Sequence, residues 1–294
     1  MPALVKLKQD IHFNAQLGGL LDALKSIAAQ QFQSLERAFQ SNPACFEALE
    51  RIAGTFKLEQ FSHPFTQSAG PIGVIVVTSD TGLLGGLNQQ SVSTAMREYR
   101  QEPGELMVVG ERGAAHVREL GLPCRVFPGV QDTGRTELAS TIRAYALDRV
   151  LSGHLAAISI VYPRALSFSV QRIELVRALP CTEWFKTASV PRGVRSGPLT
   201  LESPVPKVIE YLVWLWLGQK LFEVFGMSRL AELAARAAHL EGSSQELKRR
   251  GQKLLLRYFR ERREVIDRNI RELFAAKSLY GSPQDSAEVP EAIE

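Results

Sequence analysis

The stretch that decides the fold runs from residue 70 to residue 90 and reads GPIGVIVVTSDTGLLGGLNQQ. Its first part, Ile72–Thr78, is rich in β-branched residues and lies between glycine and a Ser-Asp pair, a pattern typical of a buried strand. A glycine-rich turn follows, and a helix is expected from about Asn88 to Arg100. This succession of strand, turn and helix is the unit that builds a parallel sheet with covering helices.

The same alternation continues to about residue 180. Further strands are expected at Leu106–Val109, 157–162 and 168–179, and further helices at 112–120 and 136–151. Strands that alternate with helices predict a mostly parallel sheet covered on both faces, with the last two strands able to form a hairpin. The predicted fold class is therefore α/β, with a central Rossmann-like domain.

The glycine-rich turn has the position of a phosphate site but not its chemistry. It lacks both the Gly-x-Gly-x-x-Gly spacing of a dinucleotide turn and the Gly-Lys-Ser/Thr ending of a mononucleotide loop. Its leucines indicate a turn that is buried against an apolar surface, so a structural role is favoured over ligand binding. The residues assigned to this structural turn are Asp80, Gly82, Gly85, Gly86 and Asn88.

Both ends of the chain carry a long helical pattern. Apolar residues recur every three or four positions in residues 4–39 and again in residues 240–273, which places a stripe on one side of each helix. Neither stripe can bury itself, so we expect an antiparallel coiled coil in which Leu17–Phe32 lies against roughly Ser244–Ile266. The alternative is two amphipathic helices that pack separately on the central domain.

These patterns divide the chain into four parts. We expect an N-terminal shaft helix at 1–66, the central α/β domain at 67–200, a C-terminal shaft helix at 201–280 and an acidic, disordered tail at 281–294.

Basic residues crowd the C-terminal helix, although the net charge is only +4. A solvated helix face is the simplest explanation, and an acidic protein surface is the functional alternative. Nucleic acid is weakly supported, because few aromatic residues lie between the basic ones and no recognised binding module is present.

Composition excludes several other classes. No secretory signal opens the chain, so we expect residence in the cytosol. Residues 208–227 approach membrane-spanning length but contain Glu210, Lys220 and Glu223, which indicates a buried or partner-facing helix without a direct membrane span. The three cysteines and five histidines are scattered, so neither a metal, a cofactor nor a catalytic site is expected.

Several motifs match one known family. Ser79–Asn88 is close to Ser-Thr-Asp-Arg-Gly-Leu-Cys-Gly-Gly-Leu-Asn, Val108–Gly113 resembles a Gly-Arg-Lys-Gly turn, and Glu232–Arg236 is similar to Ser-Glu-His-Ala-Ala-Arg. These are motifs of the gamma subunit of F-type ATP synthase, and the matches occur in order from about residue 10 to residue 276. The chain resembles that family over nearly its whole length.

The resemblance implies a non-catalytic central-stalk rotor subunit, peripheral on the cytoplasmic face of the inner (plasma) membrane. Its terminal helices would form a shaft inside a ring of alternating alpha and beta subunits. Rotation would couple ion flow, such as hydrogen ion transport, through the membrane ring of c subunits to ATP synthesis or hydrolysis. The implied partners are alpha, beta, epsilon and c subunits, without nucleic acid or cofactor.

The resemblance also implies contact residues. Leu20, Leu24 and Ile27 form a stripe toward the catalytic ring, and a basic track would face acidic segments of beta. Glu202 lies in a segment similar to Tyr-x-Phe-Glu-Pro and would be the foot contact beside the membrane ring. The track is represented by Lys253, Arg257, Arg260 and Arg263.

Departures from the family pattern cluster in the shaft, where Gly18, Gly19 and Asp22 replace basic residues. They indicate a divergent member, either the main gamma subunit of its cell or one of a second, sodium-translocating type. The alternative function is an α/β ligand-binding or hydrolytic domain dimerised through its terminal helices, and a weaker one is a nucleic-acid-binding coiled coil.

Overall fold

The computed structural model describes residues 2–39, 43–55, 61–66, 69–181 and 203–280. The internal contacts of the described residues form two compact units, one within residues 2–22 and 242–280 and the other within residues 23–241. Two helices, α1 (Pro2–Ala38) and α7 (Val205–Tyr280), contribute residues to both units.

The larger unit contains a five-stranded sheet in the order β3-β2-β1-β4-β5. Four strands are parallel, and β5 runs antiparallel to β4 as the predicted hairpin. The strands are β1 (Ile72–Val77), β2 (Pro103–Val109), β3 (Arg125–Phe127), β4 (Ala157–Ala165) and β5 (Gln171–Leu179), and the helices between them are α3 (Leu87–Tyr99), α4 (Glu111–Glu119) and α5 (Arg135–Leu151).

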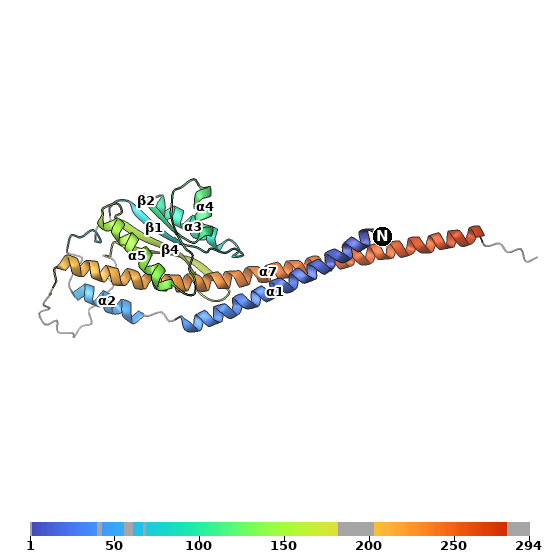
Figure 1. The fold of residues 1–294 in the computed structure, drawn as a ribbon, viewed down its shortest axis with the longest axis horizontal. Helices are drawn as coiled ribbons and strands as arrows, with labels where there is room; N and C mark the ends of the chain where they lie inside the picture. The colour runs from blue at the N-terminus through green and yellow to red at the C-terminus, as the bar shows by residue number, and fades with distance from the viewer. Residues whose placement is uncertain (1, 40–42, 56–60, 67–68, 182–202, 281–294) are drawn as a thin grey trace, which may run out of the picture. The chain divides into compact units, whose positions relative to one another are not determined.

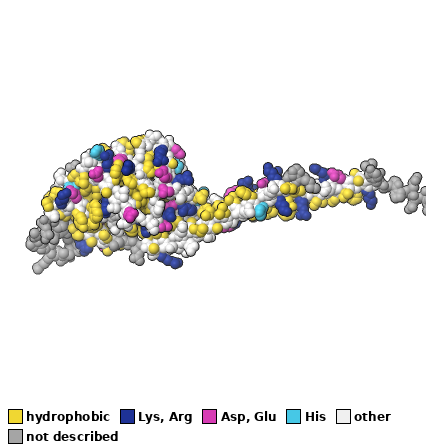
Figure 2. Space-filling model, in the orientation of Figure 1, with side chains coloured by type: hydrophobic (Ala, Val, Ile, Leu, Met, Phe, Trp, Pro, Cys, Tyr) yellow, Lys and Arg dark blue, Asp and Glu magenta, His cyan; other side chains and the backbone are white. Residues whose placement is uncertain are grey.

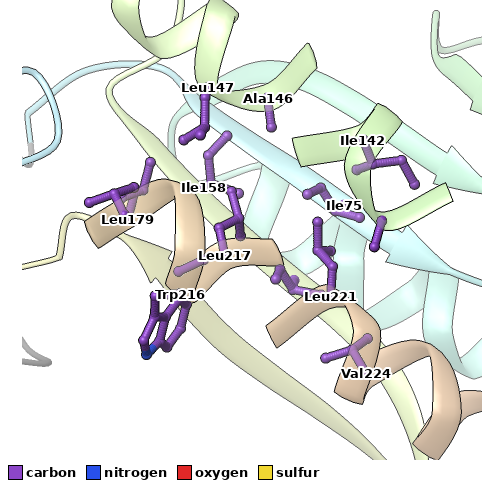
Figure 3. Close-up of a cluster of buried hydrophobic side chains, with 14 of the residues drawn as sticks. Ile75, Ile142, Ala146, Leu147, Ile158, Leu179, Trp216, Leu217, Leu221 and Val224 are labelled. Carbon is purple, nitrogen blue, oxygen red and sulfur yellow. The ribbon is translucent and has the colours of Figure 1, made fainter. Parts of the chain in front are cut away.

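Helices cover both faces of this sheet, as the alternating pattern predicted (Figure 1). Along β1, Val74 and Val76 pack with side chains of α3 and α4, whereas Ile75 and Val77 pack with α5 and α7. Figure 3 shows Ile75 and Ile158 between α5 side chains and Leu217 and Leu221 of α7. A strand buried on both faces reads as an unbroken apolar run, which is why β1 was recognisable in the sequence.

The apolar stretch 208–227 is a buried part of α7. Many of its large side chains, among them Val213, Leu217 and Phe225, are fully buried in the larger core, whereas Tyr211 and Trp214 are exposed. The charges within it are accommodated at the edge, since Lys220 and Glu223 pair at 2.8 Å. No helix in the described part of the chain is long and apolar enough to cross a membrane.

The N-terminal stretch, predicted as one shaft helix over 1–66, contains two helices in the structure. Helix α1 ends at Ala38, and α2 (Pro43–Thr55) begins at a proline. Proline suits the first position of a helix, because its fixed φ is helical and the backbone N–H that it lacks has no partner within the helix there. The boundaries of the four predicted parts remain predictions, and the tail at 281–294 lies outside the described residues.

Helices α1 and α7 pair antiparallel, as predicted, but the predicted register was wrong. In the smaller unit, Ser244 Oγ donates to Asp22 Oδ1 at 2.8 Å. In the larger unit, Phe32 packs on Leu230 and Leu233. Residues 17–32 of α1 therefore face a part of α7 that overlaps the beginning of the predicted 244–266 but is shifted toward the N-terminus of α7, to about Leu230.

Polar pairs explain the observed register. Lys25 Nζ lies 2.7 Å from Glu241 Oε2 in the larger unit, and Asn14 Nδ2 donates to the Leu247 carbonyl at 3.0 Å in the smaller one. A repeating apolar stripe tolerates several registers, whereas polar residues at the seam specify one. The stripes alone could not distinguish among these registers.

Candidate functional site

The glycine-rich turn after β1 is closed by side-chain hydrogen bonds. Asn88 accepts from the Ser79 backbone N–H at 3.2 Å and donates through Nδ2 to Ser79 Oγ at 2.9 Å. Asp80 Oδ1 accepts from the backbone N–H of Glu111 at 2.9 Å and from that of Gly129 at 3.1 Å. The carboxylate therefore joins the turn to the start of α4 and to the segment after β3.

Two of the turn's glycines adopt backbone angles that side chains disfavour. Gly85 has φ 57° and Gly86, which precedes α3, has φ 95°. Gly82 has no such requirement, because a Cβ there would lie at an ordinary 3.7 Å from Arg112. Leu83 also has a positive φ, 65°, and is 51% exposed, so one leucine of the turn points into solvent.

The other leucines of the turn pack against α7. Leu84 and Leu87 form a small buried cluster with Ala231 and Ala235. This is the apolar surface that the leucines predicted. The adjoining cavity of about 260 Å³ is lined by Gly85, Gln90, Gln171, His239 and neighbouring residues without a lysine or arginine, so it lacks the cations that hold a nucleotide phosphate.

A polar network lies beside these leucines. Glu232 of α7 accepts from Arg236 Nη2 at 2.6 Å and from Thr81 Oγ1 at 3.2 Å, and its other oxygen lies 3.0 Å from Arg229. Arg229 Nε also donates to Asp132 Oδ1 at 2.9 Å. Burial alone would lower the pKa of Arg229, but the Glu232 and Asp132 carboxylates outweigh it and raise that pKa.

Sequence reasoning had not identified this network. Glu232 and Arg236 were noticed only as part of a motif, and Thr81, Asp132 and Arg229 were not singled out. The available signal was the placement of three charged residues, three and four positions apart, in a part of α7 that is otherwise rich in alanine and leucine. Charges embedded in an apolar helix face usually have partners.

The predicted contact stripe on α1 is solvent-exposed. Leu20 lies in the smaller unit, Leu24 and Ile27 lie in the larger one, and each is more than a third exposed. Their spacing of four and three residues places them on one side of the helix. The basic track on α7 is also exposed, and its members are Lys253, Arg257, Arg260 and Arg263.

The last part of α7 exposes large apolar side chains. Leu273 and Phe274 are each 70% exposed, and Figure 2 shows hydrophobic and basic side chains next to each other on the helices of the smaller unit. The predicted pairing with α1 extended over roughly Ser244–Ile266 and so did not include Leu273 and Phe274. Several large apolar side chains within the predicted range are exposed as well. The exposed set is Leu255, Leu256, Phe259, Ile266, Ile270, Leu273 and Phe274.

Two further sequence-based expectations concern metal binding and the foot contact Glu202. Among the described residues no group of three or more histidines, cysteines or carboxylates could hold a metal ion. Glu202, the predicted foot contact, lies outside the described residues.

Comparison with known proteins identifies the family. A model of the family described as ATP synthase matches residues 4–278. The chain belongs to the ATP synthase gamma family. The gamma chain of Acidithiobacillus ferridurans is 25% identical over 272 residues, which cover 88% of this chain and 89% of the relative. The gamma chain of Chlorobaculum tepidum is 26% identical over 267 residues, with 86% and 90% covered.

Solved structures share the fold. A chain of the Euglena gracilis mitochondrial ATP synthase OSCP/F1/c-ring structure matches this gamma-family chain with a TM-score of 0.65 at 14% identity, covering 98% of this chain and 99% of that one. A chain of the rotor structure from the same organism gives 0.63 at 15% identity, with 90% and 99% covered. As a gamma chain, the protein is a non-catalytic rotor subunit of the central stalk of ATP synthase.

Proposed function

We propose that this chain couples ion flow through a membrane ring of c subunits to ATP synthesis or hydrolysis by turning inside a ring of alternating alpha and beta subunits. Each angle of the rotor favours one conformation of each neighbouring beta subunit, so rotation shifts the equilibrium among nucleotide-binding states. The complex would lie at the cytoplasmic face of the inner (plasma) membrane.

The observation that carries this proposal is the exposed apolar end of α7. Large apolar side chains that gather on a surface mark a contact with a partner. Leu273 and Phe274 are each 70% exposed, and Ile266 and Ile270 on the same helix are exposed as well. We assign this surface to the inner wall of the alpha and beta ring.

The basic track supports the same partner. Arg257, Arg260 and Arg263 are exposed on the helix that carries the apolar end, and opposite charge on beta would hold the rotor at preferred angles. Leu20, Leu24 and Ile27 on α1 would add an apolar contact. We do not include Leu83, which is exposed at the glycine-rich turn, among these contact residues.

The foot of the rotor would contact the epsilon subunit and the membrane ring. Support comes from the matching Euglena gracilis structure, an assembly of OSCP, F1 and the c-ring. Glu202 is the residue we propose for the membrane-ring contact, on the resemblance of its segment alone.

Reconstitution tests the function. The purified chain should hydrolyse no ATP alone, and should convert a mixture of alpha and beta subunits from the same cell into an active ATP hydrolase. Tight, saturable binding of ATP, ADP or NAD by the isolated chain, lost in Gly85→Val without unfolding, would instead favour the ligand-binding alternative.

A further inference from the structure

The network around Glu232 joins three separate parts of the larger unit. Thr81 follows β1, Asp132 follows β3, and Arg229, Glu232 and Arg236 belong to α7. Because β1 and β3 are parallel members of one sheet, the segments that follow them lie at the same edge. The network therefore connects α7 to one edge of the sheet at two points.

The network is buried on its α7 side, whereas its sheet-side partners Thr81 and Asp132 are exposed, with the Asp132 side chain at 56%. Glu232 is 7% exposed, and the side chains of Arg229 and Arg236 are 16% and 18% exposed. Charged hydrogen bonds screened from water gain strength and demand good geometry. The removal of the Glu232 carboxylate would take from Arg229 and Arg236 the counter-charge that they share, which is costly for side chains this far buried.

The apolar contacts of the turn constrain its position on α7 only weakly, whereas the body of the sheet is held on α7 by the large core that includes Leu217 and Leu221. Leu84 and Leu87 meet Ala231 and Ala235, whose side chains are small. Hydrophobic attraction has no preferred direction, so such a contact resists separation more than it resists sliding or rotation of the helix. Hydrogen bonds between charged groups are directional. They supply the constraint that the alanine contact lacks.

We propose that Glu232 is a positioning residue of the rotor, which holds the turn after β1 and the segment after β3 in place on α7. The inference rests on the proposed rotor function for its consequence, whereas the constraint itself can be measured in the isolated chain. Thr81 and Asp132 are the points on the sheet side that Glu232 reaches, directly and through Arg229.

Hydrogen exchange of the isolated full chain tests the constraint. In Glu232→Gln and in Thr81→Val, amides of residues 80–86 should exchange about tenfold faster or more, whereas amides of β1 should not change. Thr81→Ser retains the hydroxyl and should behave as the parent chain, while Thr81→Val retains the shape. Glu119→Gln, which removes an exposed carboxylate on α4, is the control for charge.

Equal exchange in Thr81→Val and Thr81→Ser would overturn the proposal, as would uniform acceleration across the whole sheet. Thr81→Val keeps the test decisive if Glu232→Gln does not fold.

Coupling in the reconstituted enzyme tests the consequence. Complexes with Thr81→Val or Glu232→Gln should assemble and hydrolyse ATP but pump at least about twofold fewer ions per ATP than the parent or the Glu119→Gln complex, because a loosened turn lets this edge of the sheet move relative to α7. An unchanged ratio of pumping to hydrolysis would refute the positioning role. If the parent chain itself fails to activate alpha and beta, the proposed function fails, while the exchange experiment still decides on the constraint.

Discussion

Glycine occupies two kinds of position in this chain. Gly86 has φ 95° in open space, so only its backbone angle excludes a side chain. Gly19 lies inside α1 with ordinary helical angles and equally open surroundings. The same substitution should therefore act in opposite directions at the two sites.

We expect Gly86→Ala to lower the free energy of unfolding by about 1–2 kcal/mol, because alanine is strained in the left-handed region. Gly19→Ala should raise it by up to about 1 kcal/mol, since alanine is the better helix former. Urea unfolding of the isolated chain, followed by circular dichroism, measures both. Two changes of the same sign would contradict this account of the backbone.

His63 is a buried residue whose charge state should link stability to pH. It is 6% exposed, and its Nδ1 accepts from the Phe65 backbone N–H at 3.2 Å. Burial lowers the pKa of His63, opposed in part by Glu210. The folded chain thus binds this proton less readily than the unfolded chain, in which the pKa of histidine is about 6.5.

The direction of the pH dependence follows from the linkage between proton binding by His63 and folding. The stabilising contribution of neutral His63 is complete above about pH 6.5 and is lost as the pH falls below that value. Between pH 7 and pH 5, the unfolding free energy should decrease more steeply in the parent chain than in His63→Gln, by up to about 1.4 kcal/mol per pH unit. Urea titrations at several pH values measure this difference, and identical slopes would rule it out.

At the scale of helices and strands, the long buried strands and the helices with a periodic apolar pattern could be predicted from the sequence. The β-branched run of β1 and the alternation through β5 gave the sheet and its final hairpin. Strand β3 was missed, because three residues, Arg125–Phe127, become a strand only by pairing with β2. The register of α1 on α7 was missed because polar pairs set it.

Only part of the candidate site could be predicted from the sequence. Asp80, Asn88 and the two positive-φ glycines were found through turn chemistry, which is local in sequence. The Glu232 network was missed because Thr81 and Glu232 are 151 positions apart, and no local pattern links them. The exposed apolar side chains of α7 within the predicted pairing range were misassigned, since an apolar stripe looks the same whether the chain or a partner covers it.

The exposed end of α7 yields a prediction. Leu273→Ser with Phe274→Ser should leave the unfolding of the isolated chain unchanged within about 0.5 kcal/mol, because both side chains are already in water. The same pair should weaken assembly with alpha and beta by tenfold or more, measured by titration of ATPase activation. Leu120→Ser, at another exposed leucine, is the control and should alter neither quantity.

At the scale of the whole molecule, charge on the rotor should bias its dwell angles. Reversal of Arg257, Arg260 and Arg263 to Glu places negative charge beside the acidic segments proposed on beta. Like charges about 5 Å apart at an effective dielectric near 20 repel by about 3 kcal/mol, less where salt screens them. The variant should fold and assemble but hydrolyse ATP at an altered rate and pump ions weakly into vesicles.

The matched control reverses three exposed arginines of the sheet domain, Arg97, Arg100 and Arg172. It changes the net charge equally and should pump normally. Normal pumping by the Arg257, Arg260 and Arg263 variant would mean that the track is only a solvated helix face.

The most direct test of the rotor function is to watch the chain turn. Alpha and beta subunits are fixed to a surface with this chain among them, and a gold nanorod is attached through Glu119→Cys on α4, in a background of Cys45→Ser and Cys124→Ser. We predict rotation in one direction that requires ATP and stops when ATP is removed. A complex that hydrolyses ATP while the nanorod shows no directed rotation would contradict the central claim.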